Sequence, residues 1–446
     1  MSTLAAKLES IVGTGQVRTG EEAGRFAVDG VRPEVAVFPG SVEEVSAVLT
    51  VCSEARVGVI PWGGGTSMGQ GAIPARGEVA LGLTRLDRVL EHEPADMTST
   101  VQAGMTLAAF QATLGGRGQF LALDSHRPDR ATIGGILAAN VSGPRRIRYG
   151  TARDLLIGAK IVHADGTVTK SGAKVVKNVT GYDLNKLYVG SLGTLGVIVE
   201  ACFRLYPHPP AERTWIGWFP GVANARQTVA GLLDSPLVPS ALELLSRAAA
   251  ERVASQAGLA LAAGSTLLAV AVASVPEAVA AQLDEVARMA RPQGGQGEVA
   301  AGEAHDRFWQ AVQDFSANGD PGITLKASVL PARVGDAFGR GEEIAAQHGL
   351  GLAAVSEAGT GVVRYRLWDQ AAGRDNHRRL AEAVLALRAV ASGARGSLVV
   401  LDAPPAVKTA VDVWGPAGQG LPLMRALKDQ FDPARILNPG RFVGGL

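Results

Sequence analysis

The stretch PWGGGTSMGQG, Pro61 to Gly71, is the first part of the chain whose residue types could do chemistry. It follows an apolar run, Val57 to Ile60, that is typical of a buried strand. Consecutive glycines leave backbone N–H groups uncovered, and two hydroxyls follow at Thr66 and Ser67, so the loop could bind an anion such as a phosphate. A tight turn that needs glycine at positive φ is the alternative.

This spacing excludes two familiar phosphate-binding loops. A P-loop requires a lysine followed by serine or threonine, and no lysine lies between Pro61 and Arg76. A dinucleotide fingerprint requires a third glycine and then a helix, whereas Met68 occupies that glycine position and the strand-like run Glu78 to Leu83 follows. Any anion would therefore be held by backbone amides without a following helix.

Two further glycine-rich segments carry polar groups. ATIGGILAANVSGPRRIRYGTARD, Ala131 to Asp154, places a diglycine at a helix start with four arginines nearby, which favours a diphosphate. KNVTGYDLNKLYVGSLGTLGVI, Lys177 to Ile198, repeats glycine at Gly190, Gly193 and Gly196, which permits close approach of a flat ligand such as a purine. The alternatives are a glycine packed against a neighbouring helix beside a solvated basic face, and a tight loop beneath a sheet.

Candidate residues for acid–base work lie in the second half of the chain. Lys326 is part of the otherwise apolar segment ITLKASVLP, where a buried lysine needs a partner or a lowered pKa. Arg364 and Arg366 alternate in VVRYRLW, so a strand would place both on one face, either holding a ligand or forming a solvated surface. His305 and His377 are interpreted as helix-surface residues.

Composition bounds the classes of partner. The 446 residues carry a net charge of +1, which gives no reason to expect nucleic acid or a membrane surface as the main partner. Cys52 and Cys202 are isolated, so they form neither a disulfide framework nor a zinc or iron–sulfur ligand set. No apolar stretch is long enough to span a bilayer, and MSTLAAKLESIVG lacks a signal-peptide pattern, so we expect a soluble cytoplasmic protein without membrane insertion.

Regular elements must position these residues. A strand at 34–38, a helix that begins at the capping box Ser41–Glu44 and the strand before the glycine loop predict a βαβ unit. Beyond the prolines that end at Pro210, helices alternate with isolated strands, which include Ile323 to Leu330 and Val362 to Leu367. This half is predicted to be an antiparallel sheet with helices on one face.

Taken in order, GGGTS, ATIGG…SGPRRIRYG…RD and KNVTGYDL…GSLGTLGVI resemble the FAD-binding domain of the vanillyl-alcohol oxidase/PCMH-type flavoprotein superfamily. Within it, SGPRR, KNVTGYD, SLGTLG and the terminal LKDQFDPARILNPGRF are most similar to the FAD-binding E subunit of bacterial glycolate oxidase, a relative of D-lactate dehydrogenases. The resemblance covers Pro33 to Pro207 and Leu421 to the end, and is vague between them.

The resemblance implies an α+β fold. Its parts would be an N-terminal helical segment at 1–32, a two-subdomain PCMH-type FAD-binding domain at 33–210, a substrate or cap domain with an antiparallel sheet at 211–420, and a C-terminal tail at 421–446 that packs back near the flavin.

The resemblance also implies the cofactor contacts. The glycine loop would wrap the FAD pyrophosphate, the second segment would complete the pyrophosphate and ribityl contacts, and the backbone of the third would read the adenine edge. The implied cofactor-binding residues are Pro61, Trp62, Gly63, Gly64, Gly65, Thr66, Ser67, Met68, Asp124, Thr132, Ile133, Gly134, Gly135, Asn140, Ser142, Gly143, Tyr149, Gly150, Asp154, Gly196, Val197 and Ile198. Thr66 and Ser67 stand where some relatives carry the histidine that attaches flavin covalently, and His126 is not at that position, so we expect non-covalent FAD and no metal.

Such a flavoprotein would oxidise a 2-hydroxy acid such as glycolate or D-lactate. The α-hydrogen must face the flavin, a cation must hold the carboxylate, and a base must accept the hydroxyl proton. The catalytic candidates are Lys326, Arg364 and Arg366, with Asn438 in the tail. By the same resemblance, Asn438 and Arg441 of ILNPGRF would return to the flavin site. Electrons would pass to partners, and a second flavoprotein subunit and an iron–sulfur subunit are implied.

Two alternatives stay open. Related D-2-hydroxy acid dehydrogenases carry an H-x-H motif, often with a bound metal, which this sequence lacks. The chain could therefore be a non-catalytic, FAD-binding electron-relay subunit of a larger complex. It could also be a stand-alone FAD oxidase or dehydrogenase for another alcohol or a sugar acid, since the long middle domain leaves room for such a substrate.

Overall fold

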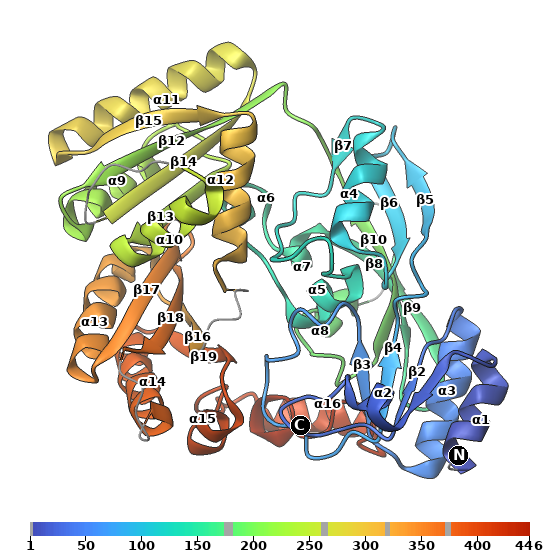
Figure 1. Cartoon of the computed structure of the whole chain (residues 1–446). Helices are drawn as coiled ribbons and strands as arrows, with labels where there is room; N and C mark the ends of the chain where they lie inside the picture. Colours follow the sequence, from blue (N-terminus) through green and yellow to red (C-terminus); the bar gives the residue numbers. More distant parts are fainter. Residues whose placement is uncertain (1–2, 174–181, 260–265, 317–321, 371–375) are drawn as a thin grey trace. The chain divides into compact units, whose positions relative to one another are not determined.

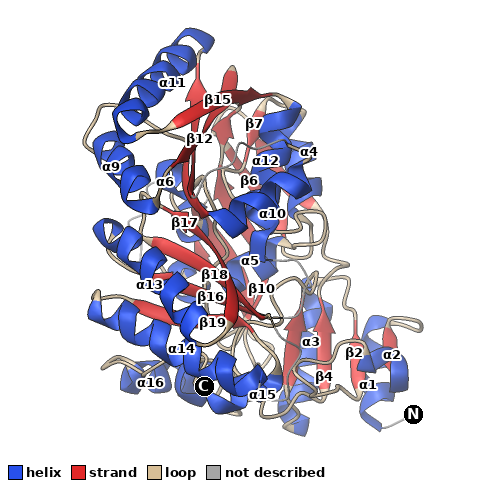
Figure 2. Cartoon of the chain, turned by 60° about the vertical axis from the view of Figure 1, so that its left-hand side comes forward, coloured by secondary structure: helices blue, strands red, loops and turns tan. Residues whose placement is uncertain are grey.

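The computed structural model describes residues 3–173, 182–259, 266–316, 322–370 and 376–446. Figures 1 and 2 show its helices and strands. The chain forms two compact units: unit 1 contains residues 1–142, 151–208 and 416–446, and unit 2 contains 143–150 and 209–415. The C-terminal segment therefore folds with the N-terminal part of the chain. Within the described ranges, no helix combines the length and apolar character that a membrane crossing requires.

Unit 1 begins with a four-stranded sheet in the order β1–β2–β4–β3. Its elements are α1 (Thr3–Val12), β1 (Val17–Thr19), α2 (Gly20–Gly24), β2 (Val35–Val37), α3 (Val42–Ala55), β3 (Val59–Trp62) and β4 (Val79–Gly82). The predicted βαβ unit is present, with β4 inserted between β2 and β3 and parallel to both. Ser41 caps α3, because its Oγ accepts the Glu44 N–H at 3.1 Å. The Glu44 carboxylate accepts the N–H of Gly40 at 2.7 Å.

The second sheet of unit 1 is antiparallel, in the order β5–β6–β10–β8–β9. Its strands are β5 (Val89–Glu93), β6 (Thr98–Gln102), β8 (Leu156–Val162), β9 (Val168–Gly172) and β10 (Val197–Arg204), beside a small pair of β7 (Gln119–Phe120) and β11 (Tyr206–Pro207). The helices are α4 (Leu107–Gly115), α5 (Ile133–Ala139), α7 (Ala152–Leu155), α8 (Asn185–Tyr188) and α16 (Leu421–Phe431). The apolar sides of α4 and α5 pack on this sheet through residues such as Phe110 and Ile136.

Unit 2 is built on an eight-stranded antiparallel sheet, in the order β15–β12–β14–β13–β17–β18–β16–β19. The strands are β12 (Ala211–Phe219), β13 (Ala241–Ser246), β14 (Thr266–Ser274), β15 (Gln296–Ala301), β16 (Ile323–Ser328), β17 (Leu350–Glu357), β18 (Val362–Asp369) and β19 (Ser397–Asp402). The helices are α6 (Arg146–Tyr149), α9 (Val222–Leu233), α10 (Arg247–Ala257), α11 (Pro276–Ala290), α12 (Glu303–Gln313), α13 (Val334–Gln347), α14 (Asn376–Gly393) and α15 (Pro405–Ala410).

Helices cover both faces of the unit 2 sheet. On one face, Leu267 and Ala269 of β14 pack with Ala249 of α10 and Phe308 of α12. Helices α9 and α11 contact the same sheet, and Figure 1 shows α11 and α12 on opposite sides of it. The antiparallel sheet is as predicted, but the prediction of helices on one face alone was wrong.

Candidate functional site

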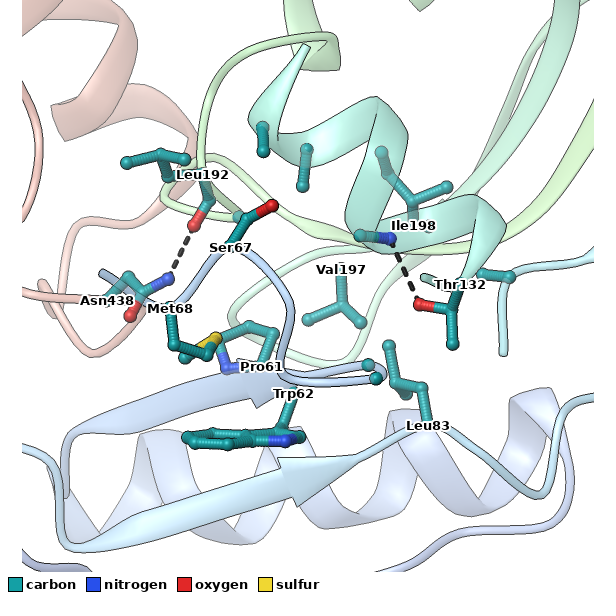
Figure 3. Close-up of a pocket in the computed structure, with 18 of the residues that line it drawn as sticks. Pro61, Trp62, Ser67, Met68, Leu83, Thr132, Leu192, Val197, Ile198 and Asn438 are labelled. Atoms are coloured by element: carbon teal, nitrogen blue, oxygen red, sulfur yellow. Dashed lines mark hydrogen bonds between the residues drawn. The ribbon is translucent and has the colours of Figure 1, made fainter. Parts of the chain in front are cut away.

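A pocket lies in unit 1 among the glycine loop, helix α5, the turn before β10 and the C-terminal segment (Figure 3). It encloses about 720 Å³ of space between atoms, part of it open to solvent. The segments that line it lie at 61–68, 132–139, 192–198 and 438–441, with Leu83 and Ala103. Three of these segments contain the glycine-rich motifs, so the fold brings together sites that are far apart in the sequence.

The glycine loop approaches the segment at 130–132 too closely for side chains. A Cβ at Gly63 would lie 2.1 Å from Thr132 Oγ1, and one at Gly64 would lie 1.7 Å from the carbonyl oxygen of Arg130. Gly65 has φ of +75°, a conformation that glycine adopts without strain. The loop therefore needs glycine for packing and for its turn, while its backbone amides can also bind an anion.

The C-terminal segment completes the pocket. The Asn438 N–H donates to the carbonyl of Val59 at 2.9 Å, and its Nδ2 donates to the carbonyl of Leu192 at 2.5 Å (Figure 3). The Asn438 Oδ1 is buried and has no hydrogen-bond partner within the described part of the chain. A buried acceptor of this kind is costly unless a ligand donates to it.

Arg441 joins the tail to the glycine loop. Its Nη2 donates to the carbonyl oxygens of Met68 at 2.6 Å and Gln70 at 2.5 Å. Burial lowers the pKa of Arg441 to about 10, and nearby Asp29 opposes that shift. His126 supports the same loop, because its Nε2 donates to the carbonyl of Thr66 at 2.8 Å.

The structure brings most of the predicted cofactor residues to this pocket. Those that line it are Pro61, Trp62, Gly63, Gly64, Gly65, Thr66, Ser67, Met68, Thr132, Gly134, Gly135, Gly196, Val197 and Ile198. The predicted residues outside its lining are Asp124, Ile133, Asn140, Ser142, Gly143, Tyr149, Gly150 and Asp154. Residues 177–181 of the KNVTGYD motif lie outside the described residues.

Local structure explains several of the residues outside the lining. Ile133 belongs to the buried core under α5, and Asn140 ends that helix in a left-handed conformation. The Asp154 carboxylate accepts the N–H of Thr151 at 2.8 Å and so caps α7, which lowers the pKa of Asp154. Tyr149 belongs to unit 2.

Eight of the lining residues were not among the predicted cofactor-binding residues. They are Leu83, Ala103, Ala138, Ala139, Leu192, Gly193, Asn438 and Arg441. Asn438 and Arg441 were expected to return to the flavin site with the tail, and the three-residue glycine repeat was a signal for the turn at 192–196.

Three of the four arginines in the second motif are engaged within unit 2. Arg145 Nη2 lies 3.4 Å from Glu212 Oε2, and Arg146 Nη1 lies 3.7 Å from Glu357 Oε2. Arg148 Nη1 donates to the carbonyl of Ala273 at 2.7 Å. All three guanidinium groups therefore have partners within unit 2.

A second polar site lies on the sheet of unit 2. Lys326 on β16 stands directly opposite Arg364 on β18, so the two side chains share a face. Arg364 is buried, its Nη2 lies 3.5 Å from Glu357 Oε1, and its Nε has no hydrogen-bond partner among the described residues. Burial lowers the pKa of Lys326, the charges of Arg146 and Arg364 add to this shift, and Glu357 opposes it. The site thus combines fixed positive charge with an amine that gives up its proton more readily than usual.

Two further charged residues complete this face. Arg366 is two positions from Arg364 on β18, and Glu243 on β13 stands opposite Glu357 on β17. Both Arg366 and Glu243 are buried. Together with Lys326 and Arg146, the face carries more positive than negative side chains, which suits an anionic ligand. Of the four predicted catalytic residues, Lys326, Arg364 and Arg366 meet here, whereas Asn438 belongs to unit 1.

His305 is buried, so the prediction of a surface position was wrong. Its Nδ1 lies 2.8 Å from the hydroxyl of Thr214, which also accepts the indole N–H of Trp309 at 2.7 Å. Its Nε2 lies 3.8 Å from Glu212 Oε2. Burial lowers the pKa of His305, and Glu212 opposes the shift. His377 is exposed, as predicted.

Comparisons with known proteins agree with this arrangement. Residues 33–172 match the FAD binding domain family, and residues 208–400 and 414–442 match the family of the C-terminal domain of FAD linked oxidases. Glycolate oxidase subunit GlcD of Bacillus subtilis is 27% identical over 416 residues, which are 92% of this chain and 88% of that protein. D-lactate dehydrogenase of Archaeoglobus fulgidus is 31% identical over 423 residues, 92% of this chain and 91% of that protein.

Solved structures support the fold. The structure of p-cresol methylhydroxylase with substrate bound matches with a TM-score of 0.75 at 17% identity, covering 98% of this chain and 96% of that one. Alkyldihydroxyacetonephosphate synthase matches with a TM-score of 0.74 at 17% identity, covering 98% of this chain and 84% of that one. The predicted α+β, PCMH-type fold class is therefore confirmed.

Proposed function

The chain belongs to the family of FAD-linked oxidases, and from that premise we propose that this FAD-dependent oxidoreductase oxidises a small 2-hydroxy acid. The observation that carries the choice of substrate is the buried cationic face formed around Lys326 and Arg364. Relatives named as D-lactate dehydrogenase, D-2-hydroxyglutarate dehydrogenase and glycolate oxidase subunit support the same substrate class.

The unit 1 pocket is the proposed seat of FAD, and its residues fit that cofactor. The loop at Gly63 to Gly65 offers backbone amides to a diphosphate, and the backbone at 196–198 offers polar groups to a purine edge. Asn438 Oδ1 offers an acceptor that no described protein group satisfies. No histidine is found among the described residues that line the pocket, which supports non-covalent binding. Bound there, FAD would supply the acceptor for the hydride that leaves carbon 2 of the substrate.

The unit 2 residues would act on the substrate. The Arg364 guanidinium would bind the substrate carboxylate, and Glu357 would hold the guanidinium in place from one side. Lys326, in its neutral form, would accept the hydroxyl proton as carbon 2 loses its hydride. Arg366 would add positive charge that attracts either the same substrate carboxylate or, in a dicarboxylic substrate, the second one.

Single substitutions test these roles. Arg364→Met should raise KM about 10- to 100-fold, because a charge-assisted hydrogen bond contributes about 1.5–3 kcal/mol. Lys326→Met should lower the rate of flavin reduction by about 100-fold or more, the usual contribution of a general base. Arg247→Gln, which removes an exposed arginine of α10 paired with Glu251, is the matched control and should change neither quantity. Normal reduction of Lys326→Met by every hydroxy acid would contradict the proposed base.

The electron-relay role is the second candidate function. The sequence has no H-x-H motif, and within the described ranges no group of three or more His, Cys, Asp or Glu residues could hold a metal ion. As an electron relay, the chain would bind FAD that hydroxy acids do not reduce, and a partner subunit would carry the substrate site. We propose a cytoplasmic complex with an iron–sulfur subunit and a second flavoprotein subunit, which the name of the GlcD relative as a subunit supports. Reduction of the isolated chain and of the assembled complex would separate the two candidates.

A further inference from the structure

A fully buried ion pair stands behind the unit 1 pocket. Lys428 on α16 places its Nζ 2.7 Å from Asp432 Oδ2 and also donates to the carbonyl oxygens of Thr194 at 2.8 Å and Leu437 at 2.9 Å. These three bonds use all three N–H donors of the ammonium group. Asp432 accepts in turn from the backbone N–H groups of Ile436 at 3.0 Å and Leu437 at 2.8 Å.

The pair joins two walls of the pocket without lining it. Thr194 belongs to the segment at 192–198, which lines the pocket, and Leu437 precedes the lining residue Asn438. The side chain of Asn438 donates to the carbonyl of Leu192, so the two walls also meet directly. Lys428 and Asp432 are 1% and 0% exposed, and neither is among the lining residues. Any effect that they have on a ligand must therefore pass through the backbone segments that they hold.

Stability alone is a weak reason for such a pair. Removing two charges from water is costly, and replacing a buried ion pair by apolar residues often stabilises a protein. Burial lowers the pKa of Lys428, and Asp432 opposes that lowering. The pair does what apolar side chains could not do: it fixes four backbone groups, Thr194 O, Leu437 O, Ile436 N and Leu437 N, in one geometry.

We propose that Lys428 and Asp432 are positioning residues that set the segments at 192–198 and 436–438 in their binding geometry before FAD enters. The inference rests on the proposed seat of FAD in this pocket and is independent of the substrate. A site ordered in advance binds more tightly, because less conformational entropy is lost when the ligand arrives.

The test is the affinity of the FAD-free protein for FAD, measured by fluorescence titration. Lys428→Met/Asp432→Asn removes both charges, while the asparagine keeps an acceptor oxygen. We expect this double variant to fold, to show unchanged far-UV circular dichroism, and to bind FAD at least tenfold more weakly. The matched control is Asp429→Asn/Arg435→Gln, which removes an exposed ion pair of 2.6 Å from the same segment and should change the affinity less than twofold. A folded Lys428→Met/Asp432→Asn variant with wild-type affinity would overturn the proposal.

Hydrogen exchange on the wild-type protein gives an answer even if the double variant does not fold. The amides of Ile436 and Leu437 should be as strongly protected without FAD as with it. Protection that develops only when FAD binds would show that the cofactor orders this segment, and the proposal would fail. Gly64→Ala tests the proposed FAD seat separately from the positioning role. Normal FAD binding by Gly64→Ala would refute the pocket as the FAD seat. Loss of binding would support that seat, and the Lys428→Met/Asp432→Asn variant would then decide whether the ion pair positions it.

Discussion

Gly64→Ala tests whether the backbone of the glycine loop holds FAD. An added Cβ would lie 1.7 Å from the carbonyl oxygen of Arg130 and 2.6 Å from its carbonyl carbon, whereas real Cβ contacts under 3.0 Å are essentially never seen. Both neighbours are backbone atoms, so no side-chain rotation can relieve the overlap. The loop must therefore withdraw from Arg130, and its amides must move away from the positions that they hold in the pocket.

The expected loss of affinity follows from the number of hydrogen bonds affected. A hydrogen bond from an amide to a charged phosphate oxygen contributes about 1.5–3 kcal/mol. Losing one or two of these hydrogen bonds weakens the binding free energy of FAD by roughly 3 kcal/mol, which corresponds to a rise of about 100-fold in its Kd. Overpacking would also lower the free energy of unfolding by about 1–3 kcal/mol.

Fluorescence titration of the FAD-free protein measures this Kd, and thermal unfolding shows whether the variant is folded. Gly115→Ala is the matched control, because a Cβ at this glycine of α4 meets no atom within 4 Å and alanine favours the helix. Its Kd should equal that of the wild type. A folded Gly64→Ala variant that binds FAD within threefold of the wild type would refute the role of this loop.

Two further predictions concern unit 2. Burial lowers the pKa of Lys326, so the neutral base becomes more abundant as pH rises through that lowered pKa. Flavin reduction in the wild type should therefore accelerate with pH. Pre-steady-state kinetics should show that this acceleration is absent in Lys326→Met. Burial also lowers the pKa of His305 below the value of about 6.5 that histidine has in the unfolded chain. At acidic pH the unfolded chain therefore binds a proton at this position more readily than the folded chain does. The free energy of unfolding should thus fall between pH 7 and pH 5, and His305→Gln should reduce this fall in urea titrations; an equal fall in both proteins would show that His305 is not responsible.

Local chemistry made much of unit 1 predictable. Ser41, Thr106 and Thr132 each cap a helix where a hydroxyl precedes an apolar pattern. The glycine motifs were recognisable because a loop that packs against backbone excludes side chains at specific positions. The run at 78–83 was expected to be a strand, but the sequence could not show that β4 lies between β2 and β3, since the pairing of strands depends on non-local contacts.

Unit 2 was less predictable for the same reason. Strands β13 and β17 are almost wholly buried runs without alternation, so periodicity did not separate them from helix or loop. Glu243 and Glu357 lie opposite each other on these strands, and the approach of Glu357 to Arg364 depends on the order of the sheet. The burial of His305 did have a signal: it shares a helical stripe with Phe308, Trp309 and Val312, at spacings of three, four and seven.

The reduction of FAD in the isolated chain tests the central claim most directly. The purified protein, loaded with FAD, would be mixed without oxygen with glycolate, D-lactate or D-2-hydroxyglutarate while its visible spectrum is recorded. We expect at least one of these acids to bleach the oxidised flavin bands, and the Arg364→Met variant to need a higher concentration of that acid. A flavin spectrum that stays oxidised with all three acids would contradict a substrate site on this chain.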